Sequence, residues 1–459
     1  MTVAFAQVCV LGAGPAGCVA AYRLATLGHK VTLLARAHNR RHMSGETVPD
    51  PVPKLLHGIG LGHVVEMAAY RLVTDGLSLW ETETPTLHPS PALLLRRDLF
   101  DALLRRSAEE AGVRVVEVAR ASPRRLSGGG WRAPLASAGV EVEAEFLVDA
   151  RGRRKGPPFG APTVALMADW RDAPSLPATT CIEAAREAWA WGGVAPNGRQ
   201  VAACFLDPER LQGLDAAARL ALYLDVLAGT RLLRPLLEGQ MCAPPLVLDA
   251  TARVAVNLGE PDRIAVGDAA VATEPLSSQG LQGAIVSALQ GAAVVHTVLT
   301  QPVDAGLALD FHRSRRLTTA RHAQRHAASF HSFALARFET PFWRRRARTG
   351  DAVPLVPANA AARAVVDAPL MLSPLTRFQD GAILDGTLIR RRRVLHHPTL
   401  DAPVAYLGRV DLSPLLEATL FPATSNQLFQ AWSPQLGPES ATAVLWWLCA
   451  QGVLIAAMR

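Results

Sequence analysis

Residues 6–36, AQVCVLGAGPAGCVAAYRLATLGHKVTLLAR, decide the fold because they place a strand, a tight turn, a helix and a second strand within about thirty residues. Gly12 permits the tight turn, Gly14 lets the backbone approach a pyrophosphate, and Gly17 lets the helix lie close to the strand. The first amides of the helix are then free to bind phosphate oxygens. The stretch therefore predicts a dinucleotide site with contacts from Gly12, Ala13, Gly14, Pro15, Ala16 and Gly17.

The end of the second strand departs from the usual pattern of dinucleotide-binding units. An acidic residue there normally binds the ribose hydroxyls, whereas this chain has Ala35 and Arg36. We therefore expect the ribose or adenine contacts to come from elsewhere, with Arg36 as a candidate. The departure weakens a prediction of NAD more than one of FAD, because other segments also hold FAD.

Length and composition indicate a folded protein of more than one domain. The chain has 459 residues, of which 49% are hydrophobic and 19% charged, and this length exceeds one ordinary hydrophobic core. The net charge is +7, yet the only lysines are Lys30, Lys54 and Lys155. Arginine therefore supplies nearly all of the positive charge.

The cysteines and the N-terminus favour a cytoplasmic protein. The six cysteines form no CxxC pair and no spacing typical of metal ligands, so we expect buried, reduced thiols and no metal site. The N-terminus, MTVAFAQVCVLGAG, has no charged segment before its apolar run. We interpret it as a first strand rather than a signal peptide.

Two further segments are similar to nucleotide-binding segments of flavoprotein monooxygenases. LLLRRDLFDALLRRSAEEAGVRVVEV resembles the Arg-x-x-Phe-Asp helix of that family, in which Arg97 would reach the cofactor. AEFLVDARGRR resembles their second nucleotide strand and ends at Asp149 and Gly152. The resemblance implies FAD as the cofactor.

A third segment, DRIAVGDAA, resembles the flavin motif of the same monooxygenases, in which Asp268 would accept hydrogen bonds from the ribityl hydroxyls. The alternative for Asp268 is a simple helix N-cap. The resemblance covers residues 5–345 and implies an α/β fold, with a Rossmann-type, glutathione-reductase-like FAD-binding domain and an interleaved substrate β-sheet. It assigns residues 1–350 to this domain, with FAD-binding segments at 1–70, 91–162 and 250–345 and sheet segments at 71–90 and 163–249.

Within this superfamily the chain most resembles the tryptophan halogenases, their hydroxylating relatives and the geranylgeranyl reductases. SGETVPDPVPKLLHGIGL is similar to their Gly-Glu loop, with Gly45 and Glu46 as the pair. EAWAWGGVAPNGRQVAACFLD resembles the strand with the halogenase W-x-W-x-I-P motif, and its Trp189 and Trp191 would bind substrate. The ending of that motif is not matched, and the alternative for the two tryptophans is one face of a strand packed in a core.

The segment EPLSSQG, residues 274–280, separates hydroxylation from halogenation. Halogenases of this type read approximately Glu-Pro-Leu-Glu-Ser-Thr-Gly there, and their second Glu works with a Lys on a strand after the Gly-Glu loop. Here the second Glu is Ser277, and the matching strand, YRLVTDGLSLW, contains no Lys. Hypohalous acid needs a cation to hold it, so we expect hydroxylation. By the same resemblance Pro275, Gly280 and Leu281 would contact the flavin.

The implied chemistry is insertion of one oxygen atom of O₂ into an electron-rich aromatic ring through a flavin C4a-hydroperoxide. Electrons would come from NAD(P)H or from reduced flavin delivered by a partner. Glu46, Asp75 and Glu274 are the candidate proton acceptors; the alternative for each is a flavin-loop or solvent-facing carboxylate. Reduction of a prenyl chain is the other activity in the superfamily.

After the flavoprotein segment the composition changes. Prolines and short apolar pieces in residues 351–382 suggest an irregular connector, and residues 383–459 suggest a small winged-helix-like α/β domain of three short helices and a strand. An apolar run at 443–458 leaves a tail anchor open, and RRRR at 390–393 leaves nucleic acid open. We expect neither a membrane nor a nucleic-acid partner.

An aromatic hydroxylase with a small polypeptide-binding domain resembles the flavoprotein monooxygenases of tryptophylquinone maturation. That resemblance implies a tryptophan side chain in a crosslinked polypeptide precursor of a small subunit as substrate, and a crosslinking maturation enzyme as a further partner. Two alternatives stay open. One is a hydroxylase or halogenase of a free or carrier-bound small aromatic in secondary metabolism, and the other is a non-catalytic flavin-binding scaffold.

Overall fold

The computed structural model describes residues 2–36, 46–119, 122–135, 140–153, 156–195, 198–348 and 369–457. The chain forms two compact units, the first from Met1–His296 with Thr319–Ala352 and the second from Thr297–Thr318 with Val353–Arg459. The FAD-type motifs all fall in the first unit.

A largely parallel sheet forms the nucleotide-binding half of the first unit. Its order is β17-β18-β9-β1-β2-β6, in which the four pairs from β18 to β6 are parallel and β17 is antiparallel. The strands are apolar because helices or other strands cover both faces, as the almost wholly buried β2 shows. The bounds are β1 (Thr2–Leu11), β2 (Val31–Arg36), β6 (Arg114–Val118), β7 (Arg124–Arg125), β8 (Trp131–Leu135), β9 (Val140–Asp149), β17 (Gly259–Glu260) and β18 (Arg263–Ala265).

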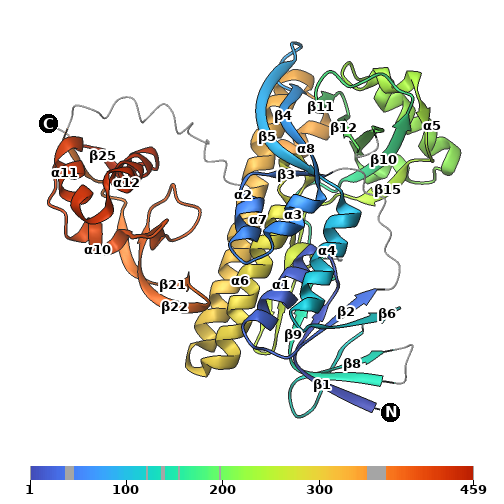
Figure 1. The fold of residues 1–459 in the computed structure, drawn as a ribbon. Coiled ribbons are helices and arrows are strands. Elements are labelled where there is room, and N and C mark those ends of the chain that lie inside the picture. Colours follow the sequence, from blue (N-terminus) through green and yellow to red (C-terminus); the bar gives the residue numbers. More distant parts are fainter. Residues whose placement is uncertain are drawn as a thin grey trace. The chain divides into compact units, whose positions relative to one another are not determined.

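Helices α1 (Pro15–Thr26) and α4 (Arg97–Glu110) lie side by side next to this sheet (Figure 1). Helix α4 buries Arg97, Phe100 and Leu104 on one side and exposes Asp98, Arg106, Glu109 and Glu110 on the other. The α/β class and the strand–turn–helix–strand predicted for residues 6–36 are confirmed.

A second, mainly antiparallel sheet forms the other half of the first unit. Its order is β14-β10-β13-β12-β11-β4-β5-β3, with β15 also paired to β10 and only β11 and β4 parallel. The bounds are β3 (Glu46–Pro49), β4 (Ala69–Leu79), β5 (Thr86–Leu95), β10 (Val164–Arg171), β11 (Thr180–Ala185), β12 (Ala188–Val194), β13 (Gln200–Leu206), β14 (Gln240–Met241) and β15 (Leu246–Asp249). This is the interleaved sheet that the resemblance implied.

The remaining elements of the first unit connect and cover the two sheets. They are α2 (Pro51–His57), α3 (Gly62–Ala68), α5 (Ala216–Ala228), β16 (Arg253–Val254), β19 (Val271–Ala272), α8 (Pro341–Ala347) and the short 3₁₀ helices η1 (Pro208–Leu211), η2 (Arg234–Glu238), η3 (Gly267–Ala269) and η4 (Pro275–Ser277). Two long helices, α6 (Gly280–Thr300) and α7 (Ala305–Phe338), have residues in both units.

Helix α6 is the one described helix that is long and apolar enough to cross a membrane, and half of its apolar window is buried inside the protein. Core helices of soluble proteins meet the same criteria, so this is weak evidence for a membrane span.

The second unit has a small apolar core around Trp432, Leu428 and Leu448. Its elements are η5 (Pro302–Asp304), β20 (Leu370–Leu372), β21 (Arg377–Asp385), β22 (Leu388–His396), β23 (Tyr406–Leu407), β24 (Val410–Asp411), α10 (Leu412–Glu417), α11 (Ser425–Leu436), α12 (Pro438–Ala450) and β25 (Leu454–Ala456). Thr424 caps α11 with a capping box.

Strand β20 pairs with β25 near the C-terminus. Strand β20 and the start of β21 thus lie in the stretch 351–382 that the sequence suggested as a connector. A partner distant in sequence orders β20, and the neighbouring strand β22 orders β21. The apolar run at 443–458 is divided between α12 and β25 by a turn at Gly452, so it forms no continuous helix.

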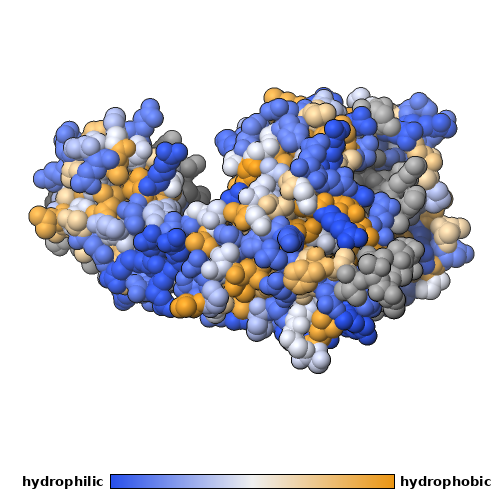
Figure 2. Space-filling view, turned by 60° about the horizontal axis from the view of Figure 1, so that its bottom comes forward, coloured by the Kyte–Doolittle hydropathy of each residue, from blue (hydrophilic) through white to orange (hydrophobic). Residues whose placement is uncertain are grey.

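The four arginines at 390–393 are exposed on β22, which pairs with β21. Figure 2 shows hydrophilic side chains gathered where these two strands lie. Arg392 contacts Asp385 and Arg393 contacts Glu417, so half of this charge is neutralised within the unit.

Candidate active site

The turn between β1 and α1 forms a cradle for a diphosphate. Gly12 has φ +101°, and a Cβ atom there would lie 2.6 Å from the carbonyl oxygen of Ala150. A Cβ atom on Gly17 would collide with the carbonyl oxygen of Gly12, whereas one on Gly14 would meet no heavy atom within 4 Å. No side chain caps the N-terminus of α1 at Gly14, so its first amides can bind phosphate oxygens. These residues fit the pyrophosphate of FAD.

The flavin motif lies directly beside this cradle. Gly267 has φ +60°, and a Cβ atom on it would be 2.6 Å from Cβ of Ala16 on α1. Asp268 follows, with its carboxylate about one-third exposed and 3.4 Å from Nε of Arg153. If the diphosphate of a cofactor binds at the N-terminus of α1, the rest of the cofactor would extend past Asp268 toward residues 274–280. We call this segment the flavin loop.

In the flavin loop Pro275 and Gly280 are exposed and Leu281 is buried. Ser278 has a positive φ of 51°, which ends η4 and starts the turn into α6. Pro275 and Gly280 can thus contact a cofactor through exposed atoms, and a contact from Leu281 stays a prediction. Arg36 is exposed at the end of β2, and Gly45 lies outside the described residues.

Arg97 and Glu46 form a buried ion pair. The Arg97 guanidinium donates to the Glu46 carboxylate and, through Nε at 3.1 Å and Nη2 at 3.2 Å, to Asp101. Burial opposes the charge of Arg97, but the two carboxylates outweigh it and raise its pKa. Glu46 is therefore a paired carboxylate that joins β3 to α4, and in this structure it is not a free base.

The other two predicted proton acceptors occupy different elements. Asp75 lies on β4, where its carboxylate accepts a hydrogen bond of 2.9 Å from Oγ1 of Thr179. Glu274 begins the flavin loop, and both of its carboxylate oxygens contact Nε2 of His331 on α7, at 3.0 and 3.1 Å. Reasoning from the sequence missed His331, because no local pattern pairs it with Glu274, which lies 57 positions earlier in the chain.

A cavity of about 380 Å³ opens beside Glu274 and His331. Its walls come from loop 158–162, from α7 and from α8, and they are lined by Pro158, Phe159, Gly160, Ala161, Pro162, Ala252, Glu274, Ala323, Gln324, Ala327, Ala328, His331, Arg345, Arg346 and Arg348. Small apolar side chains line most of it, and the polar groups lie at Glu274, Gln324, His331 and the arginines.

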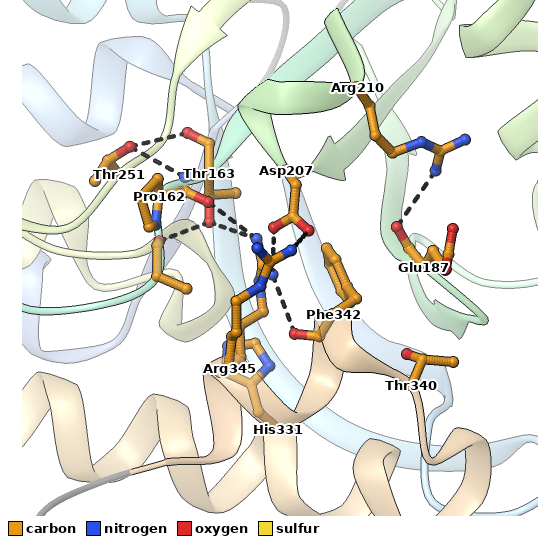
Figure 3. A network of polar contacts seen from close by, with 12 residues as sticks. Pro162, Thr163, Glu187, Asp207, Arg210, Thr251, His331, Thr340, Phe342 and Arg345 are labelled. Carbon is orange, nitrogen blue, oxygen red and sulfur yellow. Dashed lines mark hydrogen bonds and ion pairs between the residues drawn. The ribbon is translucent and has the colours of Figure 1, made fainter.

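Asp207 at the end of β13 holds the arginines of α8 (Figure 3). Its carboxylate accepts from Arg345 and, at 2.8 Å, from Nη1 of Arg346, which also donates to Oγ1 of Thr163 at 3.0 Å. Burial lowers the pKa of Arg346, and the charges of Asp207 and Glu274 oppose that effect. The carboxylate of Glu274 therefore contacts His331 directly and interacts electrostatically with Arg346.

The two tryptophans of the predicted substrate strand face a core. Trp189 is 1% exposed and stacks on Phe205 with ring centroids 3.6 Å apart, and Trp191 packs against the same cluster. Residues two apart on a strand point to one face, and here that face of β12 packs in the cluster with Trp80, Phe205 and Trp343. The prediction that Trp189 and Trp191 bind substrate stays a prediction.

The described residues contain no group of three His, Cys, Asp or Glu side chains placed to hold a metal ion.

Comparison with known proteins agrees with this geometry. Residues 5–155 match the FAD binding domain family. A tryptophan 2-halogenase of Chondromyces crocatus is 25% identical over 366 residues, 73% of this chain and 70% of the halogenase. CmlS, a flavin-dependent halogenase of known structure, is 18% identical with a TM-score of 0.80 over 99% of this chain and 96% of its own, which shows a shared fold.

A solved relative covers both units at higher identity. It is QhpG, a peptidyl tryptophan dihydroxylase essential for tryptophylquinone cofactor biogenesis, and it is 30% identical with a TM-score of 0.75 over 98% of this chain and 100% of its own. With the FAD-binding domain, the diphosphate cradle and the flavin loop, this similarity shows that the chain belongs to the FAD-dependent monooxygenases of the halogenase-like superfamily.

Proposed function

We propose that this monooxygenase hydroxylates the indole ring of a tryptophan in a polypeptide precursor during tryptophylquinone biogenesis. The observation that carries the proposal is the similarity to the peptidyl tryptophan dihydroxylase, which extends through the second unit and covers that enzyme's whole length. CmlS, a flavin-dependent halogenase, also matches 99% of this chain, so the second unit does not by itself select a polypeptide substrate; the higher identity to the dihydroxylase, 30% against 18%, favours it.

The flavin loop favours hydroxylation over halogenation. The two residues that halogenases of this type use to handle hypohalous acid have no counterpart, because position 277 is Ser and strand β4 contains no Lys. Arg346, a cation that interacts electrostatically with Glu274 of the loop, is engaged by Asp207, Thr163 and the backbone.

Bound FAD supplies activation of O₂ when it is reduced, and the protein supplies binding, orientation and exclusion of water. The diphosphate cradle and Asp268 would hold the cofactor. Hydroxylation replaces a ring hydrogen by oxygen, so the ring loses a proton that a nearby base must accept. Glu274 is the carboxylate at the cavity wall that can take this proton, and Asp75 is the second candidate.

The cavity is the size of a site for one small molecule or side chain, since ligand pockets span roughly 300–1,000 Å³. A single aromatic side chain fits a volume of 380 Å³, and the rest of a polypeptide would stay outside. Its apolar alanines and Phe159 suit a ring better than a charged metabolite.

The test measures how tightly the consumption of electrons and O₂ is coupled to formation of the hydroxylated product. Purified holoprotein is supplied with NAD(P)H or with a flavin reductase, and oxygen consumption and peroxide release are measured with the precursor polypeptide, with free tryptophan and with buffer. We expect the precursor to suppress peroxide release and to gain oxygen, and free tryptophan to do neither. Equal or better coupling with free tryptophan would redirect the proposal to a small aromatic substrate.

A further inference from the structure

We infer that His331 is a positioning residue that fixes the flavin loop by holding the carboxylate of Glu274. The inference rests on the part of the proposed function that places a flavin beside this loop, and it is independent of which aromatic ring is hydroxylated.

The contact between the two side chains is short, doubled and shielded from solvent. Nε2 of His331 lies 3.0 Å from one Glu274 oxygen and 3.1 Å from the other. The His331 side chain is 1% exposed and that of Glu274 14%. Because a hydrogen bond to a charged group is stronger than a neutral one and is weakened least where water is excluded, this pair can hold a loop in place.

The imidazole has this one polar task. Its Nδ1 is buried and has no hydrogen-bond partner among the described residues, so the ring donates from Nε2 and the carboxylate accepts. Nε2 is therefore the ring nitrogen through which His331 contacts the loop.

Two tryptophans fix the ring itself. Trp80 and Trp343 lie with ring centroids 6.4 and 5.6 Å from that of His331. Nε1 of Trp80 donates to the carbonyl of Phe330, the residue before His331, and Nε1 of Trp343 donates to the carbonyl of Ala185. The donor of the loop contact is therefore anchored to the substrate sheet and not only to α7.

The loop has a second attachment in the same cluster, because Leu276 packs against these aromatic residues. The apolar packing of Leu276 does not fix the orientation of the loop, whereas the hydrogen bond between Glu274 and His331 has a preferred geometry. Without His331 the Glu274 carboxylate would lose this hydrogen bond, and Arg346, whose charge acts on Glu274, is already engaged by Asp207. We therefore expect that, without His331, the loop becomes more mobile but still packs through Leu276.

His331 acts through Glu274 and does not reach the cofactor, since its side chain is almost wholly buried. A positioning role differs from simple packing in a testable way. The role needs an N–H at the place of Nε2, and packing needs only the volume of the ring.

The experiment measures hydrogen exchange of the amides of residues 276–281 and the dissociation constant of FAD for the parent protein, H331L and H331Q. Gln carries an amide N–H close to the position of Nε2, and Leu carries none. We expect H331L to speed loop exchange and weaken FAD by at least about tenfold, the range for a lost hydrogen bond to a charged group. H331Q should stay within about threefold of the parent, since it keeps that bond.

H326L is the matched control, because His326 lies on the same helix and contacts Phe330 rather than the loop. It should leave both readouts unchanged. If H331L leaves loop exchange and FAD affinity at the parent values, or if H331Q is as impaired as H331L, the inference is wrong. Neither readout uses a substrate, so a failure here is distinguishable from a failure of the proposed reaction.

Discussion

At the residue scale, Gly14 and Gly17 lie three positions apart and serve different purposes. A methyl group on Gly14 meets open space, and one on Gly17 meets the carbonyl oxygen of Gly12. We predict that G14A changes the stability of the cofactor-free protein by less than about 1 kcal/mol and weakens FAD about tenfold or more, because the backbone can no longer approach the diphosphate. G17A should instead destabilise the cofactor-free protein by roughly 1–3 kcal/mol, as overpacking does. Thermal unfolding and flavin fluorescence titration measure the two effects, and a stable G14A variant with parent affinity for FAD would remove the diphosphate from this cradle.

A second prediction at this scale concerns the pair His29 and His296, whose Nε2 and Nδ1 atoms are 2.9 Å apart. Burial lowers the pKa of both, with smaller contributions from His296 acting on His29 and Arg23 acting on His296. The folded state thus disfavours protonation. The stability that this provides is complete above the unfolded pKa of about 6.5 and is lost as the pH falls through the lowered folded values.

Denaturant unfolding between pH 7 and pH 5 checks this prediction. H29Q should lose less stability over that range than the parent. H57Q is the control of opposite sign, because the carbonyl of Pro53 and the carboxylate of Glu66 raise the pKa of exposed His57. A loss of stability that is unchanged in H29Q would show that the pair does not titrate as described.

Some residues could be read from the sequence and others could not. The spacing of Gly12, Gly14 and Gly17 specifies a backbone geometry, so it could be recognised before the structure. The role of Trp189 could not be assigned in this way. The two-residue spacing of Trp189 and Trp191 predicts that both side chains point to the same face of a strand, but it does not predict what covers that face. His331 carries no pattern at all, and its role depends on a contact over 57 positions of chain.

At the element scale, α8 depends on Asp207. The helix has only seven residues, and a helix of this length is not stable alone. Arg346 is 1% exposed and pairs with Asp207, which is 11% exposed. The ion pair of Asp207 with Arg346 therefore contributes more to the stability of the fold than a surface ion pair does.

We predict that D207A destabilises the protein by about 3–5 kcal/mol, because it leaves the Arg346 guanidinium buried without its carboxylate. E110A, which removes the partner of exposed Arg106, should cost less than about 1 kcal/mol. Denaturant unfolding compares the two variants. Equal costs would mean that α8 is held by packing of Phe342 and Trp343 and not by the ion pairs.

Elements with a strong local pattern could be predicted and those ordered by distant partners could not. The strand–turn–helix–strand of residues 6–36 has its turn and its periodicity within one segment. Strand β20 has three residues that pair with β25 more than eighty positions later, and prolines around it favour a loop locally. Tertiary pairing therefore overrode local preference there.

At the scale of the whole molecule, the FAD-binding half is assembled from segments far apart in the sequence. β18 adds to β9 across more than one hundred residues, and β11 adds to β4 in the second sheet in the same way. The arrangement could be predicted only because the order of the motifs resembles that of a known family. No local sequence signal specifies a strand partner at such a distance. The second unit is the part that the similarity to the peptidyl tryptophan dihydroxylase extends over and that the FAD motifs do not explain.

The measurement that tests the central claim most directly is mass analysis of the precursor polypeptide after turnover of the reduced holoenzyme in isotopically labelled O₂, with bromide present. The account predicts one or two labelled oxygens on a tryptophan residue of the polypeptide and no bromine. Bromine on the ring, or labelled oxygen on a free aromatic with none on the polypeptide, would contradict it.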